Sequence, residues 1–240
     1  KNPYLALLDS VVQNTAELIS SWMLVGFIHG VMNTDNTAIS GETIDYGPCA
    51  FMDGFNPNKT FSSIDSGGRY AYNHQPMIGQ WNLTRFAETL LKLLDKNQDN
   101  SIAIAKKSIE SFWFSFEKAF HDGLCKKIGL NTSDENGTKL AFEFLDLLSK
   151  SEVDFTTAYR SLGDYAEKEN KSEFKNLFDS KPDIDNWLAR WSDKLSDEGK
   201  NTAEIKKQMN SVNPIFIPRN HQIERAIELA TRAEDFSLME

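Results

Sequence analysis

The sequence has 240 residues, of which 40% are hydrophobic and 25% are charged, and its formal net charge is −9. These values are typical of a soluble globular chain with one substantial core or two small ones. The acidic balance argues against a nucleic-acid partner, because phosphate contacts need an excess of Lys and Arg, and it argues more weakly against an anionic membrane surface. No apolar run approaches the roughly 18 residues that span a bilayer, so we expect neither nucleic acid nor membrane as a partner.

The first predicted element is a long helix. Asn2 and Pro3 form a helix start, with an N-cap residue followed by proline at the first helical position. Apolar residues then recur at three- and four-residue spacing, at Leu5, Leu8, Val12, Ala16, Ile19 and Met23. We expect about six turns that end before Gly26 and lead into the next segment.

The segment 29–53 reads as a loop, a short hairpin and a second loop. Its β-prone stretches, Thr37–Ser40 and Thr43–Ile44, flank Gly41, which suits a tight turn. A hairpin here would bring Asn36 and Asp45 close together. An amide oxygen and a carboxylate are ligands that Mg²⁺ accepts, with water and phosphate completing its shell.

This arrangement is typical of phosphotransferases of the protein-kinase type, in which a catalytic-loop Asn and the Asp of an Asp-Phe-Gly turn hold the metal ions. Here the turn reads Asp45-Tyr46-Gly47. A kinase catalytic loop places its base Asp five residues before the metal Asn, and that position is Val31. The carboxylate nearest to Asn36 is instead Asp35.

The remainder of the chain predicts mostly helices. Residues 51–76 lack periodicity, and helices are then expected from Pro76 onward. The first of these has a buried face that contains Trp81, and the stretch Trp81-Asn82-Leu83 is expected to fix the preceding loop. The last helix, from His221 to Asp235, is expected to turn a set of apolar residues inward, namely Ile223, Ala226, Ile227 and Ala230. The predicted fold class is mainly α with a small β-hairpin at the metal site.

Six stretches, in order, resemble the selenoprotein O family of protein adenylyltransferases: HGVMNTDN, TIDYGP, GRYAYNHQP, WNLTRFA, DFTTAYRSL and NPIFIPRN. The resemblance runs from about Tyr4 to about Asp235 and corresponds to the C-terminal half of the family's proteins. It implies a kinase-like fold that binds ATP in reversed orientation and transfers AMP to Ser, Thr or Tyr hydroxyls of proteins. By this resemblance Asp35 is the catalytic base, Asn36 and Asp45 bind the metal, and Asp45 also serves nucleotide binding.

The same resemblance implies ATP and Mg²⁺ or Mn²⁺ as cofactors. It predicts a single kinase-like C-terminal lobe over residues 1–240, with a family-specific helical extension from about residue 96. No Gly-rich phosphate loop and no strand Lys precede Asp35, so the nucleotide-binding N-terminal lobe is expected to lie outside this chain. We therefore expect the 240 residues alone to be inactive. The distant cysteines, Cys49 and Cys125, indicate a reducing compartment: the bacterial cytoplasm, or the mitochondrion in a eukaryote.

Two other readings remain open from the residues. One is an atypical protein kinase that transfers the γ-phosphoryl group and uses Asp35 in place of the missing base. The other is a catalytically silent pseudokinase or binding module that keeps the metal ligands. Val31 counts against the first, and the intact set of Asp35, Asn36 and Asp45 counts against the second.

Overall fold

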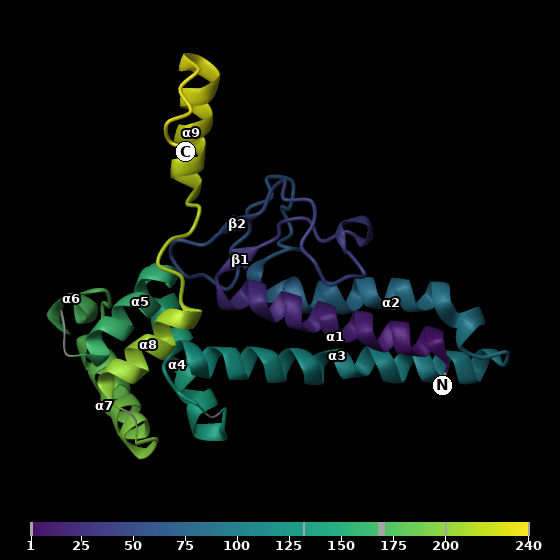
Figure 1. Ribbon diagram of the computed structural model, residues 1–240, viewed down its shortest axis with the longest axis horizontal. Coiled ribbons are helices and arrows are strands. Elements are labelled where there is room, and N and C mark those ends of the chain that lie inside the picture. Colours follow the sequence, from purple (N-terminus) through teal and green to yellow (C-terminus); the bar gives the residue numbers. More distant parts are fainter. Residues whose placement is uncertain (1, 132, 168–170, 200, 240) are drawn as a thin grey trace.

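The computed structural model describes residues 2–131, 133–167, 171–199 and 201–239, and this part of the chain is mainly α-helical, as predicted (Figure 1). Its helices are α1 (Pro3–Leu24), α2 (Gln75–Leu94), α3 (Gln98–Lys127), α4 (Glu135–Lys150), α5 (Phe155–Ala166), α6 (Lys171–Asn176), α7 (Lys181–Asp197), α8 (Thr202–Val212) and α9 (Asn220–Ala233). Two 3₁₀ turns, η1 (Thr34–Asn36) and η2 (Tyr72–His74), lie between α1 and α2. Within the described residues, no helix is long and apolar enough to cross a membrane.

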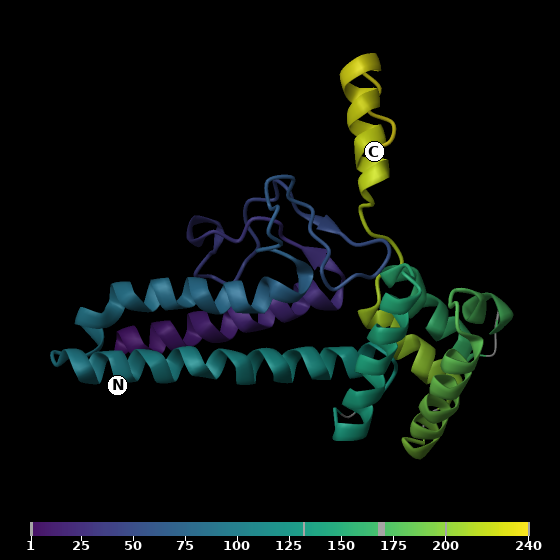
Figure 2. The same ribbon diagram turned by 180° about the vertical axis from the view of Figure 1, so that it is seen from behind.

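Helices α1, α2 and α3 lie side by side and form one elongated bundle (Figures 1 and 2). Its first helix begins and ends where the sequence predicts. The Asn2 side chain accepts hydrogen bonds from the backbone amides of Tyr4 and Leu5 at 2.9 and 3.3 Å, which satisfies amides that have no partner within the helix. The Asn2 amide group also donates to the carbonyl of Leu94 at 2.8 Å, so the same residue ties the start of α1 to the end of α2.

Helices α4 to α8 form a second group at the C-terminal end of α3 (Figure 1). Its centre is a stack of large rings: Phe144 lies 4.7 Å from Trp187, and Trp187 lies 5.7 Å from Trp191, measured between ring centroids. Each indole N–H finds a carbonyl, Trp187 that of Leu140 and Trp191 that of Ile128. Buried Trp is stable only with such a partner, so these bonds let the rings be fully enclosed.

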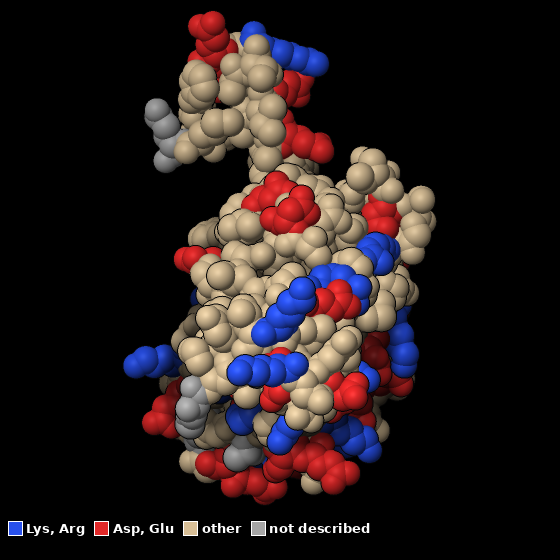
Figure 3. All heavy atoms as spheres, turned by 90° about the vertical axis from the view of Figure 1, so that its right-hand side faces the viewer, with Lys and Arg blue, Asp and Glu red and all other residues tan. Residues whose placement is uncertain are grey.

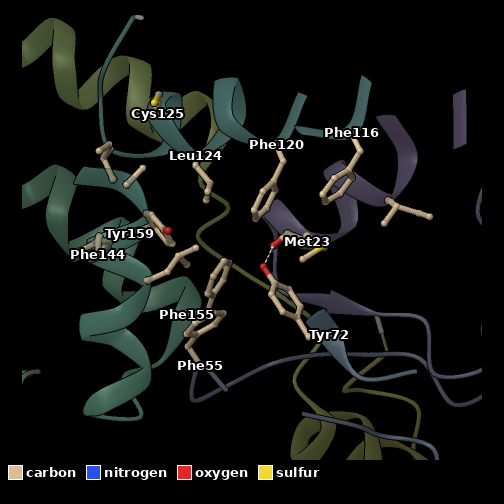
Figure 4. Packing of buried hydrophobic residues seen from close by; sticks show 14 of the residues in the cluster. Met23, Phe55, Tyr72, Phe116, Phe120, Leu124, Cys125, Phe144, Phe155 and Tyr159 are labelled. Carbon is tan, nitrogen blue, oxygen red and sulfur yellow. Dashed lines mark hydrogen bonds between the residues drawn. The ribbon is translucent and has the colours of Figure 1, made fainter. Parts of the chain in front are cut away.

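Aromatic residues also join the two helical groups (Figure 4). The Phe155 ring lies between Phe55 and Tyr159, with centroid distances of 5.4 and 5.1 Å. Tyr72 packs on Phe55, and its hydroxyl donates to the carbonyl of Met23 at 2.7 Å. The loops that follow α1 are thereby packed into one continuous core with both helical groups.

A buried cation lies at the same junction. The Lys127 ammonium, at the end of α3, donates to Asn213 Oδ1 at 2.7 Å and sits 3.9 Å from the centroid of the Tyr159 ring. Burial lowers the pKa of Lys127 to about 7, because removal from water disfavours the charged form. The ring face and the amide oxygen offset part of that cost.

The two-stranded antiparallel sheet is present, but its strands are not the predicted ones. Strand β1 (Phe27–Ile28) pairs with β2 (Ala50–Phe51) in the register Phe27 to Phe51, whereas Thr37–Ser40 and Thr43–Ile44 form no strand. Gly41 does form a turn, with a backbone φ of +76°, and its amide donates to the carbonyl of Ala38. The sheet therefore closes the base of the whole 29–49 loop and not its tip.

The last helix forms as predicted and buries Ala226, but two other residues that were expected to turn inward are exposed. Helix α9 projects away from both helical groups (Figures 1 and 2), and its residues Ile223 and Ile227 are 41% and 51% exposed. Figure 3 shows an uncharged surface along this helix, with charged side chains at its margins, above a body on which acidic and basic groups are interspersed. The 3.6-residue periodicity correctly predicts a helix with an apolar side, but it does not identify what packs there.

Trp81 is also more exposed than predicted, at 43%. Its ring lies under two guanidinium groups, those of Arg69 and Arg85, at 5.1 and 5.4 Å from the ring centroid. Such stacking lets a large ring remain at the surface.

Candidate functional site

The site is built on the loop that follows β1, and His29 fixes its start. His29 is buried, and its Nε2 donates to the carbonyl of Ile44 at 2.8 Å. Nε2 carries the proton in this bond, because a carbonyl only accepts; Nδ1 faces the backbone amide of Val31 at 3.4 Å. His29 is therefore a structural hydrogen-bonding residue, and it connects the first loop to the residue before Asp45.

Gln75, at the start of α2, holds the same backbone. Its side chain is fully buried, with Oε1 accepting from the amide of His29 at 3.0 Å and Nε2 donating to the carbonyl of Phe27 at 3.1 Å. The sequence analysis missed this residue. A Gln before a helix proline carries no local signal that separates a buried anchor from a solvated side chain.

Side chains from outside the loop hold the 3₁₀ turn η1. Asn82 on α2 donates to the carbonyl of Met32 at 3.0 Å and to Thr37 Oγ1 at 2.9 Å. The Tyr70 hydroxyl donates to Asn33 Oδ1 at 2.6 Å. The stretch Trp81-Asn82-Leu83 is predicted to fix residues 51–76, and of these three residues Trp81 contacts Arg69 in that segment. Asn82 instead holds the loop after β1, a role that the sequence analysis missed, as it missed that of Tyr70.

Gly30 lies against the turn that carries Asp45. Its backbone φ is +87°, and a β-carbon at this position would lie 2.8 Å from the carbonyl oxygen of Pro48. Only glycine meets both conditions without strain. The loop containing Asp35 and the turn containing Asp45 therefore touch through Gly30 and Pro48, in addition to the bond between His29 and Ile44.

Trp22, at the end of α1, is a further anchor. Its indole N–H donates to Thr43 Oγ1 at 2.8 Å, and its ring lies 5.4 Å from the His29 ring. One tryptophan thus contacts the start of the loop and the segment that leads into Asp45.

The three predicted site residues lie on these two anchored segments. Asp35 is exposed on η1. Asn36 is half-buried, and its amide nitrogen donates to the carbonyl of Val31 at 3.0 Å, which leaves Oδ1 as the atom available to a metal ion. Asp45 is exposed, with a φ of +55°, a left-handed conformation that Asp tolerates better than most residues. Within the described residues, no hydrogen bond or ion pair links these three side chains to one another.

The available oxygen atoms, Asn36 Oδ1 and the Asp45 carboxylate, suit a metal ion that takes most of its ligands from outside the protein. Among the described residues, no group of three or more His, Cys, Asp or Glu side chains could hold a metal ion. One amide oxygen and one carboxylate match the one or two protein ligands that Mg²⁺ takes beside phosphate oxygens and water. The residues present fit a nucleotide-bound Mg²⁺ and not a structural ion.

Cys49, four residues after Asp45, is not set up as a nucleophile. It is half-buried, and its thiol donates to the carbonyl of Tyr46 at 3.3 Å. Burial is the largest effect and raises the pKa of Cys49; a backbone hydrogen bond lowers the pKa by less, and the nearby Asp45 carboxylate raises it by a smaller amount still. A raised pKa keeps the thiol protonated, and the thiolate is the reactive form.

Comparison with known proteins gives a consistent result over the whole chain. The family profile described as protein adenylyltransferase SelO matches residues 1–240. Proteins named protein nucleotidyltransferase YdiU match all 240 residues, with 47% identity in Rhodopseudomonas palustris strain BisB18 and 48% in Bradyrhizobium diazoefficiens. The protein of that name in Rhizobium meliloti is 47% identical over an alignment of 241 positions. In each case the chain spans about half, 49%, of the relative's own length.

Proposed function

Because this chain belongs to the SelO family of protein adenylyltransferases, we propose that a protein carrying it transfers AMP from ATP to Ser, Thr or Tyr hydroxyls of other proteins. The hydroxyl oxygen attacks the α-phosphorus, the bond from that phosphorus to the bridging oxygen of the β-phosphate breaks, and pyrophosphate leaves. The hydroxyl proton passes to the Asp35 carboxylate. Asn36 Oδ1 and the Asp45 carboxylate would hold the Mg²⁺ or Mn²⁺, which would neutralise phosphate charge.

One observation carries the proposal. Asp35 is an exposed carboxylate on a turn whose backbone is fixed by buried groups, including Asn82, and the turn with Asp45 is packed against the same loop. A base must be free to reach its proton while its backbone stays in place. Gly30 and His29 supply that rigidity without occupying the carboxylates.

The nucleotide and phosphate contacts of the complete enzyme are assigned in this proposal to a further lobe, because Asn36 and Asp45 provide only the metal end of a site. The adenine pocket and the cationic phosphate ligands of kinase-like enzymes come from such a lobe. The acceptor protein then approaches from the side on which Asp35 is exposed.

The decisive experiment uses a protein that contains this chain together with the sequence that completes the length of its relatives. Incubation with acceptor protein and ATP labelled at the α-phosphate should transfer label, and ATP labelled at the γ-phosphate should not. Label from the γ-position alone would establish a kinase, and label from neither a binding module.

Asp35→Asn should lower AMP transfer by about 100-fold or more, because removal of a general base typically costs this much. Glu42→Gln is the matched control, since Glu42 is another exposed carboxylate of the same loop. Equal activity of the two variants would remove Asp35 from the mechanism.

A further inference from the structure

A cavity of about 320 Å³ lies directly beside the loop that carries Asp35. Its walls come from α1, α2, the first residue of η1 and the residues just after η1, and they are mainly apolar. The residues that form its apolar floor and rim are Val11, Ala38, Ile39, Leu83 and Phe86. Thr34 and Thr37, one residue before and two residues after Asp35, complete the wall next to the base.

We propose that this cavity receives an aliphatic or aromatic side chain of the acceptor polypeptide, two residues from the hydroxyl that is modified. The proposal rests on the proposed function and adds a substrate preference to it. Under this proposal, the cavity determines which acceptor peptides are preferred for AMP transfer.

The position of the cavity sets the two-residue spacing. The α-carbons of Asp35 and Thr37 are two peptide units apart and so at most about 7.6 Å from each other. In an extended peptide, alternate side chains point to the same face and are separated by about 6.6 Å. A peptide that presents its hydroxyl to Asp35 can therefore place a side chain at the second position before or after it beside Thr37.

The size and chemistry of the cavity select the kind of side chain. About 320 Å³ is ample space for one Leu, Met or Phe side chain, and the apolar floor and rim favour such a side chain over a polar one. The cavity's cation, Arg85, is already engaged, since its guanidinium pairs with Glu88 at 2.8 Å and lies over Trp81. An acidic or phosphorylated side chain is therefore not the favoured occupant.

Asn82 supplies a second, independent indication of a ligand. It lines the cavity and is 4% exposed, and within the described part of the chain its Oδ1 has no hydrogen-bond partner. Its Nδ2 is fully used on Met32 and Thr37. A buried acceptor without a donor is unfavourable, and an N–H from the main chain of a docked peptide would satisfy it after a small opening of the rim.

The test compares three acceptor peptides that are identical except at the second residue from the hydroxyl, where they carry Leu, Ala or Asp. The enzyme is a protein with the full length of the relatives, and the ATP is labelled at the α-phosphate. The Leu peptide should have a KM about tenfold below that of the Ala peptide, a typical effect of one apolar pocket, at similar kcat. Thr89→Phe fills the cavity from α2, where Thr89 is exposed. It should raise the KM of the Leu peptide to that of the Ala peptide and leave the KM for ATP unchanged.

Leu93→Phe is the matched control. It adds the same ring to an exposed position one turn further along α2, and the Leu preference should survive. Thermal melting of both variants establishes that they are folded. AMP transfer without any preference among the peptides would overturn this inference and leave the proposed function standing. A raised KM for ATP in Thr89→Phe would assign the cavity to the nucleotide, and no transfer to any acceptor would overturn both.

Discussion

At the level of a single residue, Gly30 is the point where the loop with Asp35 touches the turn with Asp45. Replacement by Ala would place a methyl group 2.8 Å from the Pro48 carbonyl oxygen at a φ of +87°. We predict that Gly30→Ala lowers the free energy of unfolding by about 2 kcal/mol, measured by urea denaturation. Gly67→Ala is the control, because its added carbon would meet nothing within 4 Å. Equal stability of the two variants would contradict the role assigned to Gly30.

The lowered pKa of Lys127 predicts that the stability of the fold depends on pH. Its pKa in the folded chain is about 7, below the ordinary value of 10.5, so between these values the unfolded chain binds more protons than the folded one. The free energy of unfolding should therefore rise from pH 7 to pH 9.5 through this group. The Tyr159 ring lies against the Lys127 ammonium, and burial raises the pKa of the Tyr159 hydroxyl, so Tyr159 stays neutral over this range. Arg160 on α5 donates to the carbonyl of Asn213, the residue whose side chain accepts from Lys127.

The measurement is urea unfolding at the two pH values. In Lys127→Met the free energy of unfolding should no longer rise between these pH values. In Lys126→Met, which alters an exposed neighbour on α3, the rise should remain. An unchanged rise in Lys127→Met would mean that another group causes it.

At the level of elements, Arg219 connects three parts of the chain. Its guanidinium donates to Asp154, the N-cap residue of α5, at 2.6 and 3.2 Å, and also to Asp53 beyond β2. Burial alone would raise the pKa of Asp154, but hydrogen bonds from Arg219 and Thr157 outweigh it and lower that pKa. This contact anchors residues 213–219, the connector between α8 and α9 from which α9 projects.

We predict that Arg219→Met releases the connector. Phe216 within it is 85% exposed, and chymotrypsin should cleave after it faster in this variant than in the unaltered chain. Arg232→Met serves as control, because Arg232 pairs only with Glu228 of its own helix among the described residues. Equal cleavage rates in the two variants would show that Arg219 does not restrain the connector.

Helices could be predicted from the sequence where capping residues, proline or glycine mark their ends. Asn2, Pro3 and Gly26 mark the limits of α1 by capping and backbone preference, and the structure agrees. The strands could not be predicted, because each has two residues, too few for an alternating pattern to appear. The exposure of α9 could not be predicted either, since periodicity reveals that a helix has an apolar side but not what packs against that side. For the site, motif spacing indicated Asn36 and Asp45, and the family resemblance indicated Asp35. The anchors Gln75 and Tyr70 act across long sequence separations and leave no local signal.

For the molecule as a whole, the prediction concerns nucleotide binding by the 240 residues alone. Mg²⁺ binds weakly to one carboxylate and one amide without phosphate oxygens held elsewhere. We therefore expect this chain to bind Mg-ATP weakly or not at all in isothermal titration, and to transfer no AMP. Micromolar affinity would place the nucleotide site within these residues and contradict the division between lobes. A protein of the relatives' full length is the positive control.

The contacts of Trp22 also have an optical consequence. Its indole N–H is bonded to Thr43 and its ring lies beside His29, so its excited state senses the polarity and quenching groups of the loop itself. Any rearrangement of residues 43–46 when a nucleotide arrives would change that ring's surroundings. Trp22, one of five tryptophans in the chain, is thus an intrinsic fluorophore beside the candidate site. The difference in stopped-flow emission between the unaltered protein and Trp22→Phe could follow the loop in real time without a chemical label.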